Sequence, residues 1–210
     1  MQKGDFILID FVGKIKLTDE VFDLTIESEA KKAGIYNEKK EYKPVLVIMG
    51  AGNVVSGVEK QLEKMKPGEE KNFSVNPEDG FGKRNPLSVK IVSIKKFLEK
   101  NINPVPGIYV DIGGIPCRIQ SVSGGRVRVD FNHPLAGKEL GYNLKIVKKL
   151  SGAKIQIESI LEKFEIKGTV TVKEKNVDIK LEGKSKPELN KPISEFIKKW
   201  VKDIKKINFK

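Results

Sequence analysis

The chain has very little of the residue types that most often carry chemistry. Its 210 residues include one cysteine, Cys117, and one histidine, His133. A single cysteine excludes an internal disulfide and a cysteine metal cluster, which fits a reducing interior and predicts a cytoplasmic protein. A single histidine leaves no histidine-based metal site and no Ser-His-Asp triad. We therefore expect neither a metal nor a cofactor, and we interpret both residues as structural.

Long apolar runs and arginines are also scarce. No run approaches the roughly 18–20 apolar residues that span a bilayer, so no membrane partner is expected. The start carries Asp5 and Asp10 among its apolar residues, which indicates a strand and not a secretory signal. Of 40 basic residues against 28 acidic ones, four are arginine, and the net charge is +12. Lysine interspersed with glutamate is typical of a solvated surface, and also of proteins from hot environments. A basic balance permits contact with nucleic acid.

Residues 50–70 predict a Gly-rich turn, one short amphipathic helix and a Pro-Gly turn. Val58, Leu62 and Met65 recur at i, i+4 and i+7, which places them on one helical face. Pro67-Gly68 ends the helix. A lone short helix among strands can bury such a face only against a sheet. Taken alone, the segment is most simply a core helix, so its function depends on its neighbours.

Period-two alternation predicts strands on both sides of this helix. The expected strands are 6–16, 21–26, 44–49, 71–75, 87–92, 107–113, 115–122, 126–131 and 142–146, followed by a hairpin of 165–173 and 176–182. Residues 27–43 are expected to form a polar excursion, and residues 93–100 a short helical turn. Two helices are expected near the end of the chain, one around Ile155–Phe164 and one with Pro192 near its first turn that runs to Ile204.

These patterns predict an α+β protein of three domains. The first is discontinuous and comprises 1–84 and 132–150. The second, 85–131, is a small β unit near the size at which a core can just be sustained. The third, 151–210, holds 15 Lys against 9 acidic residues. Because an isolated two-stranded hairpin is marginal, we expect this third domain to form a homodimer.

Several motifs follow one another in a recognisable order. They are ILIDFVGKIK at 7–16, Val-Phe-Asp at 21–23, G-x-G-x-V-V-x-G-V-E-x-x-L-x-x-M-x-x-G-E at 50–69, Asp-Gly-Phe-Gly at 79–82 and NHPLAGKELGYNLKI at 132–146. This order resembles the FKBP-type peptidyl-prolyl cis-trans isomerases, more closely their SlyD-like branch and its long archaeal members. The resemblance covers about residues 1–150. It implies an FKBP-like antiparallel sheet wrapped on one short helix, with an inserted small β domain and a C-terminal α/β module.

The resemblance also implies site residues wherever the motifs align. The implied catalytic residues are Phe11, Asp23, Phe81 and Tyr142. Asp23 would be a polar helper near the carbonyl of the X–Pro bond that rotates during the reaction. The implied substrate-binding residues are Phe22, Val45, Val54, Val55 and Val58, with Val58 as the pocket floor. Many members have tyrosine where this chain has Phe11 and Phe81, and tryptophan where it has Val58. We therefore expect a shallower pocket with a weaker grip on short peptides.

The reaction asks little of the protein. An X–Pro bond isomerises slowly because amide resonance sets a barrier of roughly 18–20 kcal/mol. A dry apolar pocket binds the twisted amide better than the planar one, which is differential transition-state binding. No nucleophile, metal or general base is needed, so their scarcity is consistent with activity.

Two functions remain open at this point. The first is an isomerase and folding chaperone that acts on X–Pro bonds of unfolded or nascent polypeptides, with the inserted domain binding substrate chains as the SlyD-like resemblance implies. The second is a weakly catalytic or non-catalytic peptide-binding adaptor or holdase. It would dock to ribosomes, RNA or another protein through the basic domain 151–210. No RNA-recognition motif supports base reading by that domain.

Overall fold

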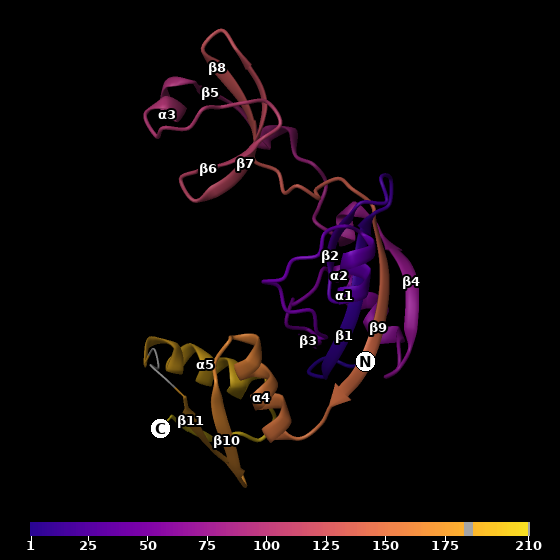
Figure 1. The fold of residues 1–210 in the computed structure, drawn as a ribbon. Helices are drawn as coiled ribbons and strands as arrows, with labels where there is room; N and C mark the ends of the chain where they lie inside the picture. Colours follow the sequence, from indigo (N-terminus) through magenta and orange to yellow (C-terminus); the bar gives the residue numbers. More distant parts are fainter. Residues whose placement is uncertain (183–186, 210) are drawn as a thin grey trace. The chain divides into compact units, whose positions relative to one another are not determined.

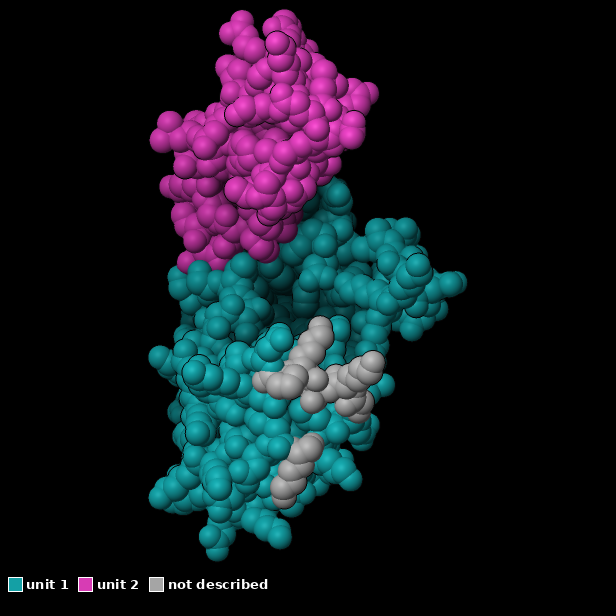
Figure 2. Space-filling view, turned by 90° about the vertical axis from the view of Figure 1, so that its left-hand side faces the viewer, with its two compact units in different colours: residues 1–75, 140–210 teal, residues 76–139 magenta. Residues whose placement is uncertain are grey.

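The computed structural model describes residues 1–182 and 187–209 (Figure 1). The chain divides into two compact units, which Figure 2 shows in different colours. Residues 1–75 and 140–210 form the first unit, and residues 76–139 form the second. The second unit is continuous in sequence and interrupts the first, and the predicted insert 85–131 lies within it. The three domain boundaries given above stay predictions.

An antiparallel sheet forms the centre of the first unit. Its strand order is β2-β1-β9-β4, and β3 pairs with β1. Successive side chains on a strand point to opposite faces, so β9 buries Leu140, Tyr142, Leu144 and Ile146 on one face. The strands are β1 (Phe6–Ile15), β2 (Val21–Leu24), β3 (Val45–Ile48), β4 (Glu70–Val75) and β9 (Leu140–Leu150).

The helix α2 (Ser56–Lys64) confirms the interpretation of residues 50–70. Val58 and Leu62 are buried on it, and Met65 is buried directly after its last residue. A hydrogen bond of 3.2 Å from Lys71 on β4 to the Gln61 side chain ties the helix to the sheet. The apolar stripe is therefore covered, as expected of a lone helix packed on a sheet.

The polar excursion 27–43 contains a helix that the sequence analysis missed, α1 (Glu27–Lys32). It carries one buried apolar side chain, Ala30, so a hydrophobic period is hardly visible in the sequence. Its ion pairs are local, with Lys31 on Glu27 and Lys32 on Glu29. Acidic residues in the first turn and basic ones in the last suit the helix dipole.

The C-terminal segment builds a second sheet whose order is β10-β11-β12. The predicted hairpin is confirmed by the antiparallel pair β10-β11, but the sequence analysis missed the third strand of this sheet, since β12 pairs parallel with β11. The last helix begins before the predicted start, so Pro192 lies inside it, and it ends at Trp200, short of Ile204. The elements are α4 (Ala153–Lys163), β10 (Gly168–Lys173), β11 (Asn176–Leu181), α5 (Pro187–Trp200) and β12 (Lys206–Phe209).

One hydrophobic core joins this segment to the first sheet. The sheet contributes the side chains that point away from the Tyr142 face, and the C-terminal segment contributes its helices and strands. Because the core is shared, residues 151–210 pack as part of the first unit. The buried members are Phe6, Leu46, Ile48 and Leu150 from the first sheet, with Ile157, Ile160, Leu161, Val170, Val177, Ile179, Ile193, Ile197 and Val201.

The second unit holds an antiparallel sheet of order β5-β8-β7-β6. Both predicted hairpins are confirmed, and Gly113-Gly114 and Gly124-Gly125 have positive φ at their turns. Buried side chains come from Phe97 and from one face of the strands, Cys117, Ile119, Val127 and Val129. The elements are β5 (Val89–Ser93), α3 (Lys95–Leu98), β6 (Tyr109–Ile112), β7 (Ile115–Ser123) and β8 (Arg126–Asp130), after short 3-10 turns at Pro77–Asp79 and Pro86–Ser88.

The architecture confirms the α+β fold predicted from the sequence. Antiparallel sheets carry most of the chain, and few helices cover them (Figure 1). None of the helices within residues 1–182 and 187–209 has the length and apolar character needed to cross a membrane.

Candidate active site

Tyr142 lies at the centre of an aromatic cluster in the first unit. Its ring centroid is 6.2 Å from that of Phe11, 5.8 Å from that of Phe22 and 5.7 Å from that of Phe73. Phe22 meets Tyr142 edge-on, whereas Phe73 stacks on it. Tyr142 is 8% exposed, and the three phenylalanines are half-buried. The cluster therefore presents aromatic carbon to a ligand.

Strand register brings this cluster together. Across the order β4-β9-β1-β2, Phe73 pairs with Tyr142, Tyr142 with Gly13, and Gly13 with Asp23. The register then shifts, because Lys14 pairs with Val21 and leaves Phe22 in a bulge. Bulges commonly re-aim a side chain near a functional site.

Gly13 leaves the space into which Phe22 fits. A Cβ at position 13 would lie 2.6 Å from Cζ of Phe22, well inside contact distance. Because position 13 carries no side chain, the Phe22 ring can cross β1 and reach Tyr142.

Asp23, the β2 member of this line of paired residues across the sheet, is exposed to solvent. Its Oδ1 accepts a hydrogen bond from the backbone N–H of Leu24 at 2.9 Å and lies 3.1 Å from the Lys40 ammonium. Lys40 also donates to the Leu24 carbonyl at 3.1 Å. The pair is about half exposed, so it contributes little to stability. Its effect is to hold the carboxylate in one orientation beside the aromatic cluster.

Burial, followed by the negative charge of Asp23, raises the pKa of the Tyr142 hydroxyl to about 12. The Asp23 carboxylate is thus within electrostatic reach of the Tyr142 ring. At neutral pH the hydroxyl is protonated and can donate a hydrogen bond.

The raised pKa predicts a pH dependence of stability. Because the pKa of Tyr142 is higher in the folded chain than its usual value of 10.0, its contribution is complete below pH 10 and is lost as pH rises through about 12. The difference between a pKa of 10.0 and one of about 12 corresponds to up to about 2–3 kcal/mol of unfolding free energy. A Tyr142→Phe variant should lack that part of the alkaline decline, measured by denaturant unfolding. Its phenolate absorbance should differ from that of the native chain only near pH 12, and a difference near pH 10 would contradict the assignment.

The loop before α2 carries Val54 and Val55, both half-buried. The Asn53 side chain accepts the N–H of Ile48 at 2.9 Å, and the Glu59 carboxylate accepts the N–H of Gly50. Val55 is the N-cap residue of α2 in an extended conformation. These bonds fix the two valines at the N-terminal end of the helix, while Val58 is 2% exposed and faces the interior.

Val45 and Phe81 are two further predicted site residues. Val45 is 40% exposed and lines a cavity of about 320 Å³ beside Leu8, Ser159 and Lys163. Phe81 belongs to the second unit, where it stacks on His133 with ring centroids 4.3 Å apart. Their roles in substrate binding stay predictions, as do those of the residues above.

The sequence analysis assigned no role to Gly13 and missed two further residues of this region. Phe73 stacks on Tyr142, and the signal for it was the alternation of Phe73 and Val75 in the predicted strand. Thr25 is 6% exposed, accepts from the N–H of Phe11 at 2.9 Å and donates to Asp10 at 2.8 Å. It holds β1 against the end of β2, where no motif marks it.

The site is an apolar surface of aromatic rings edged by one carboxylate. Within residues 1–182 and 187–209, no three His, Cys, Asp or Glu side chains gather closely enough to hold a metal ion. Such a surface can bind a proline ring and withdraw an amide from water, which suits catalysis of a conformational change in a peptide.

Comparison with known proteins gives the family. Residues 1–98 match the family described as FKBP-type peptidyl-prolyl cis-trans isomerase, and residues 90–135 match the IF domain of FKBP26. The short-type peptidyl-prolyl cis-trans isomerase of Methanocaldococcus jannaschii is 34% identical over 146 residues, 70% of this chain and 92% of the relative. The SlyD isomerase of Helicobacter pylori is 30% identical over 151 residues, 69% of this chain and 80% of the relative. The chain therefore belongs to the FKBP-type peptidyl-prolyl cis-trans isomerases, and its predicted likeness to the SlyD branch is confirmed.

Proposed function

We propose that the protein is an isomerase and folding chaperone that acts on X–Pro bonds of unfolded or nascent polypeptides in the cytoplasm. The family gives the isomerase activity, and the Tyr142 cluster is the observation that supports the location of the site. Proline would pack on the rings of Phe11, Phe22 and Tyr142. The Asp23 carboxylate, held by Lys40, would lie beside the carbonyl of the rotating bond.

The proposed chemistry is differential binding of a twisted amide. When the X–Pro bond rotates, it loses resonance and charge separation, so an environment without water favours the twisted form. The aromatic rings supply that environment. Asp23 and the protonated Tyr142 hydroxyl would fix the peptide so that rotation occurs about one bond only.

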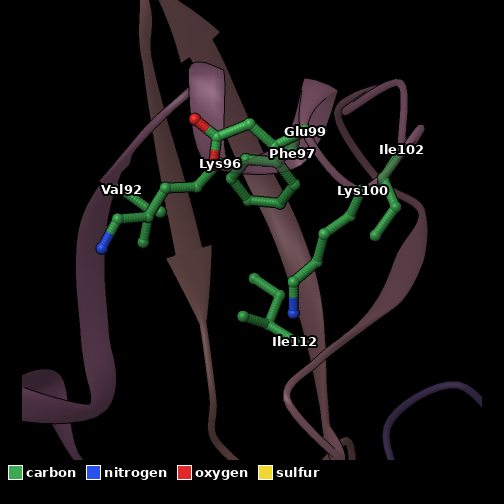
Figure 3. Close-up of a pocket in the computed structure, with 7 residues that line it drawn as sticks. All are labelled: Val92, Lys96, Phe97, Glu99, Lys100, Ile102 and Ile112. Atoms are coloured by element: carbon green, nitrogen blue, oxygen red, sulfur yellow. The ribbon is translucent and has the colours of Figure 1, made fainter.

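The inserted domain supports the chaperone part of the proposal. A cavity of about 220 Å³ opens in it, and Figure 3 shows the Phe97 ring between Val92 and Ile102, with Ile112 across the cavity. Lys96, Glu99 and Lys100 also line the cavity. An apolar floor with charged edges suits apolar side chains of an unfolded chain, and the charged rim limits self-association.

One experiment separates the two activities. Asp23→Asn should lower isomerisation of a short proline peptide by about tenfold or more, because it removes the oriented charge. It should leave suppression of aggregation intact. Replacing residues 86–130 with a short linker should abolish suppression of aggregation and leave isomerisation of the short peptide intact. This cut keeps the reciprocal bonds between Asn85 and Asn132, which are 2.8 and 2.9 Å long.

The matched control for the charge change is Asp19→Asn. Asp19 is also paired with a lysine, Lys14 at 3.1 Å, but lies outside the aromatic row. Exchange NMR measures the isomerisation, and light scattering of an unfolded test protein measures the holdase activity. If Asp23→Asn and Asp19→Asn are equally active, the proposed role of Asp23 is wrong. If the insert-deleted chain still suppresses aggregation, the holdase lies elsewhere.

Homodimerisation through 151–210 and ribosome association also stay proposals. The added strand β12 weakens the argument from a thin sheet, since three strands and a shared core need no second copy for stability. The adaptor function is the second candidate. It is favoured only by the excess of lysine over acidic residues in this segment, and sedimentation of the full chain would test the dimer.

A further inference from the structure

Three of the four arginines of the chain lie on one face of the inserted sheet. Arg118 sits between the buried Cys117 and Ile119 on β7, so its side chain takes the opposite face. Arg126 and Arg128 flank the buried Val127 on β8 in the same way. We call this outward surface the arginine face. It is defined by Ile91, Ser93, Tyr109, Arg118, Ser121, Ser123, Arg126 and Arg128.

Strand pairing shows that these residues are neighbours. Arg128 pairs with Ile91 on one side and Ser121 on the other. Arg126 pairs with Ser93 and Ser123, and Arg118 pairs with Tyr109 on one side and with Asp130 on the other. Directly paired residues share a face of the sheet. The face is thus a band of guanidinium groups flanked by serine hydroxyls, with exposed apolar groups at Ile91 (69%) and Tyr109 (55%).

Little on this face neutralises the charge. Across residues 1–182 and 187–209, no ion pair or side-chain hydrogen bond involves any of the three guanidinium groups. Asp130 is 4% exposed and is held by Arg84, Gln120 and Asn132. Asp111 at the edge accepts from the N–H of Gly114 at 2.7 Å. Between 85 and 131 the sequence has seven basic residues against three acidic ones. The arginine face therefore carries a local positive potential.

The presence of arginine in place of lysine narrows the chemical class of the binding partner. Nearly all other cations of this chain are lysine, which would serve equally well to attract the carboxylates of an acidic protein. Guanidinium differs from ammonium because it is planar, binds phosphate with two parallel hydrogen bonds and stacks on aromatic faces. An exposed tyrosine on a flat sheet is a platform for a base, and serine hydroxyls donate to phosphate oxygens.

We propose that the arginine face binds single-stranded nucleic acid without sequence preference, with phosphates on Arg118, Arg126 and Arg128 and a base on Tyr109. Its residues belong to the second unit, whereas Tyr142 belongs to the first. The arginine face is also on the opposite side of the sheet from Val92 and Phe97 of the chaperone cavity. The proposal does not depend on the assigned isomerase or holdase sites.

Fluorescence anisotropy with labelled oligouridylate and oligothymidylate tests the proposal on the full chain. Three phosphate contacts predict that log K falls with log salt with a slope of about −2. The variant Arg118→Gln/Arg126→Gln/Arg128→Gln should bind at least about tenfold more weakly and lose most of that slope. Tyr109→Ser should weaken binding and leave the slope unchanged, because it removes stacking and no charge.

The matched control is Lys95→Gln/Lys96→Gln/Lys100→Gln, which removes the same charge from the α3 side of the insert. It should change binding by less than about twofold. The variant Arg118→Lys/Arg126→Lys/Arg128→Lys should keep the salt slope and lose affinity. This result would separate the effect of charge from that of guanidinium geometry. Equal losses in the arginine and α3 variants, or no binding of either oligonucleotide, would overturn the proposal. So would arginine-dependent binding of polyglutamate in place of the oligonucleotides.

Discussion

A Gly13→Ala variant is expected to isomerise a short proline peptide about ten- to a hundredfold more slowly than the native chain, because small displacements at a site can cost this much. The added Cβ would lie 2.6 Å from Cζ of Phe22. The ring must then leave its edge-on contact with Tyr142, at 5.8 Å between centroids. The proline-binding surface loses one wall, while Asp23 stays on the same strand row. Exchange NMR on a short peptide measures the rate.

The neighbouring strand offers a matched control in Gly141→Ala. Gly141 precedes Tyr142, pairs with Lys14, and no heavy atom lies within 4 Å of a Cβ built there. This variant should keep full activity. Overpacking at Gly13 should lower the unfolding free energy by only about 1–3 kcal/mol, so both variants should fold. A Gly13→Ala enzyme as active as Gly141→Ala would show that Phe22 is not part of the working site.

The contrast between these glycines shows what the sequence could not give. The sequence analysis named Phe11, Phe22, Asp23 and Tyr142 because each lies in a motif with a family resemblance. Gly13 and Phe73 were missed, because their roles depend on strand register, and a one-residue shift moves a side chain to the other face. The bulge that admits Phe22 is such a shift, and no single-sequence pattern marks it.

The segments outside the motifs show a second limit. The helix α2, the hairpins of the insert and the final helix were predicted because their hydrophobic periods are strong. α1 has one buried apolar side chain, and β12 has four residues, so neither produces a clear period. Whether residues 151–210 fold apart from or against the first sheet depends on long-range packing. Phe6, Leu46 and Ile48 contribute to that packing, but only the strand register shows that their side chains face the C-terminal segment.

An Ile157→Ala variant is expected to lower the unfolding free energy of the whole first unit by about 2–5 kcal/mol, the usual cost of a large cavity in a core. Ile157 on α4 is fully buried in the core that also contains Phe6, Ile48 and Leu150. The cavity therefore removes contacts from the first sheet as well as from the C-terminal helices. Ile155→Ala is the matched control, since Ile155 on the same helix is 49% exposed and should cost less than about 0.5 kcal/mol.

Two probes at opposite sides of the core make the test specific. Trp200, the only tryptophan of the chain, packs against this core from α5, so its fluorescence reports on residues 151–210. Isomerase activity reports on the Tyr142 face of the first sheet. In denaturant, both signals should disappear in one transition, and Ile157→Ala should shift both midpoints equally.

A chain that ends at Leu150 follows from the same argument. It would expose Phe6, Leu46, Ile48 and Leu150 together, and a contiguous apolar surface of this kind promotes aggregation. We therefore expect it to sediment as large species and not as a stable monomer. If Trp200 fluorescence and activity are instead lost at different denaturant concentrations, and the shortened chain stays monomeric and active, then residues 151–210 are an independent domain and the shared core contributes nothing to the site.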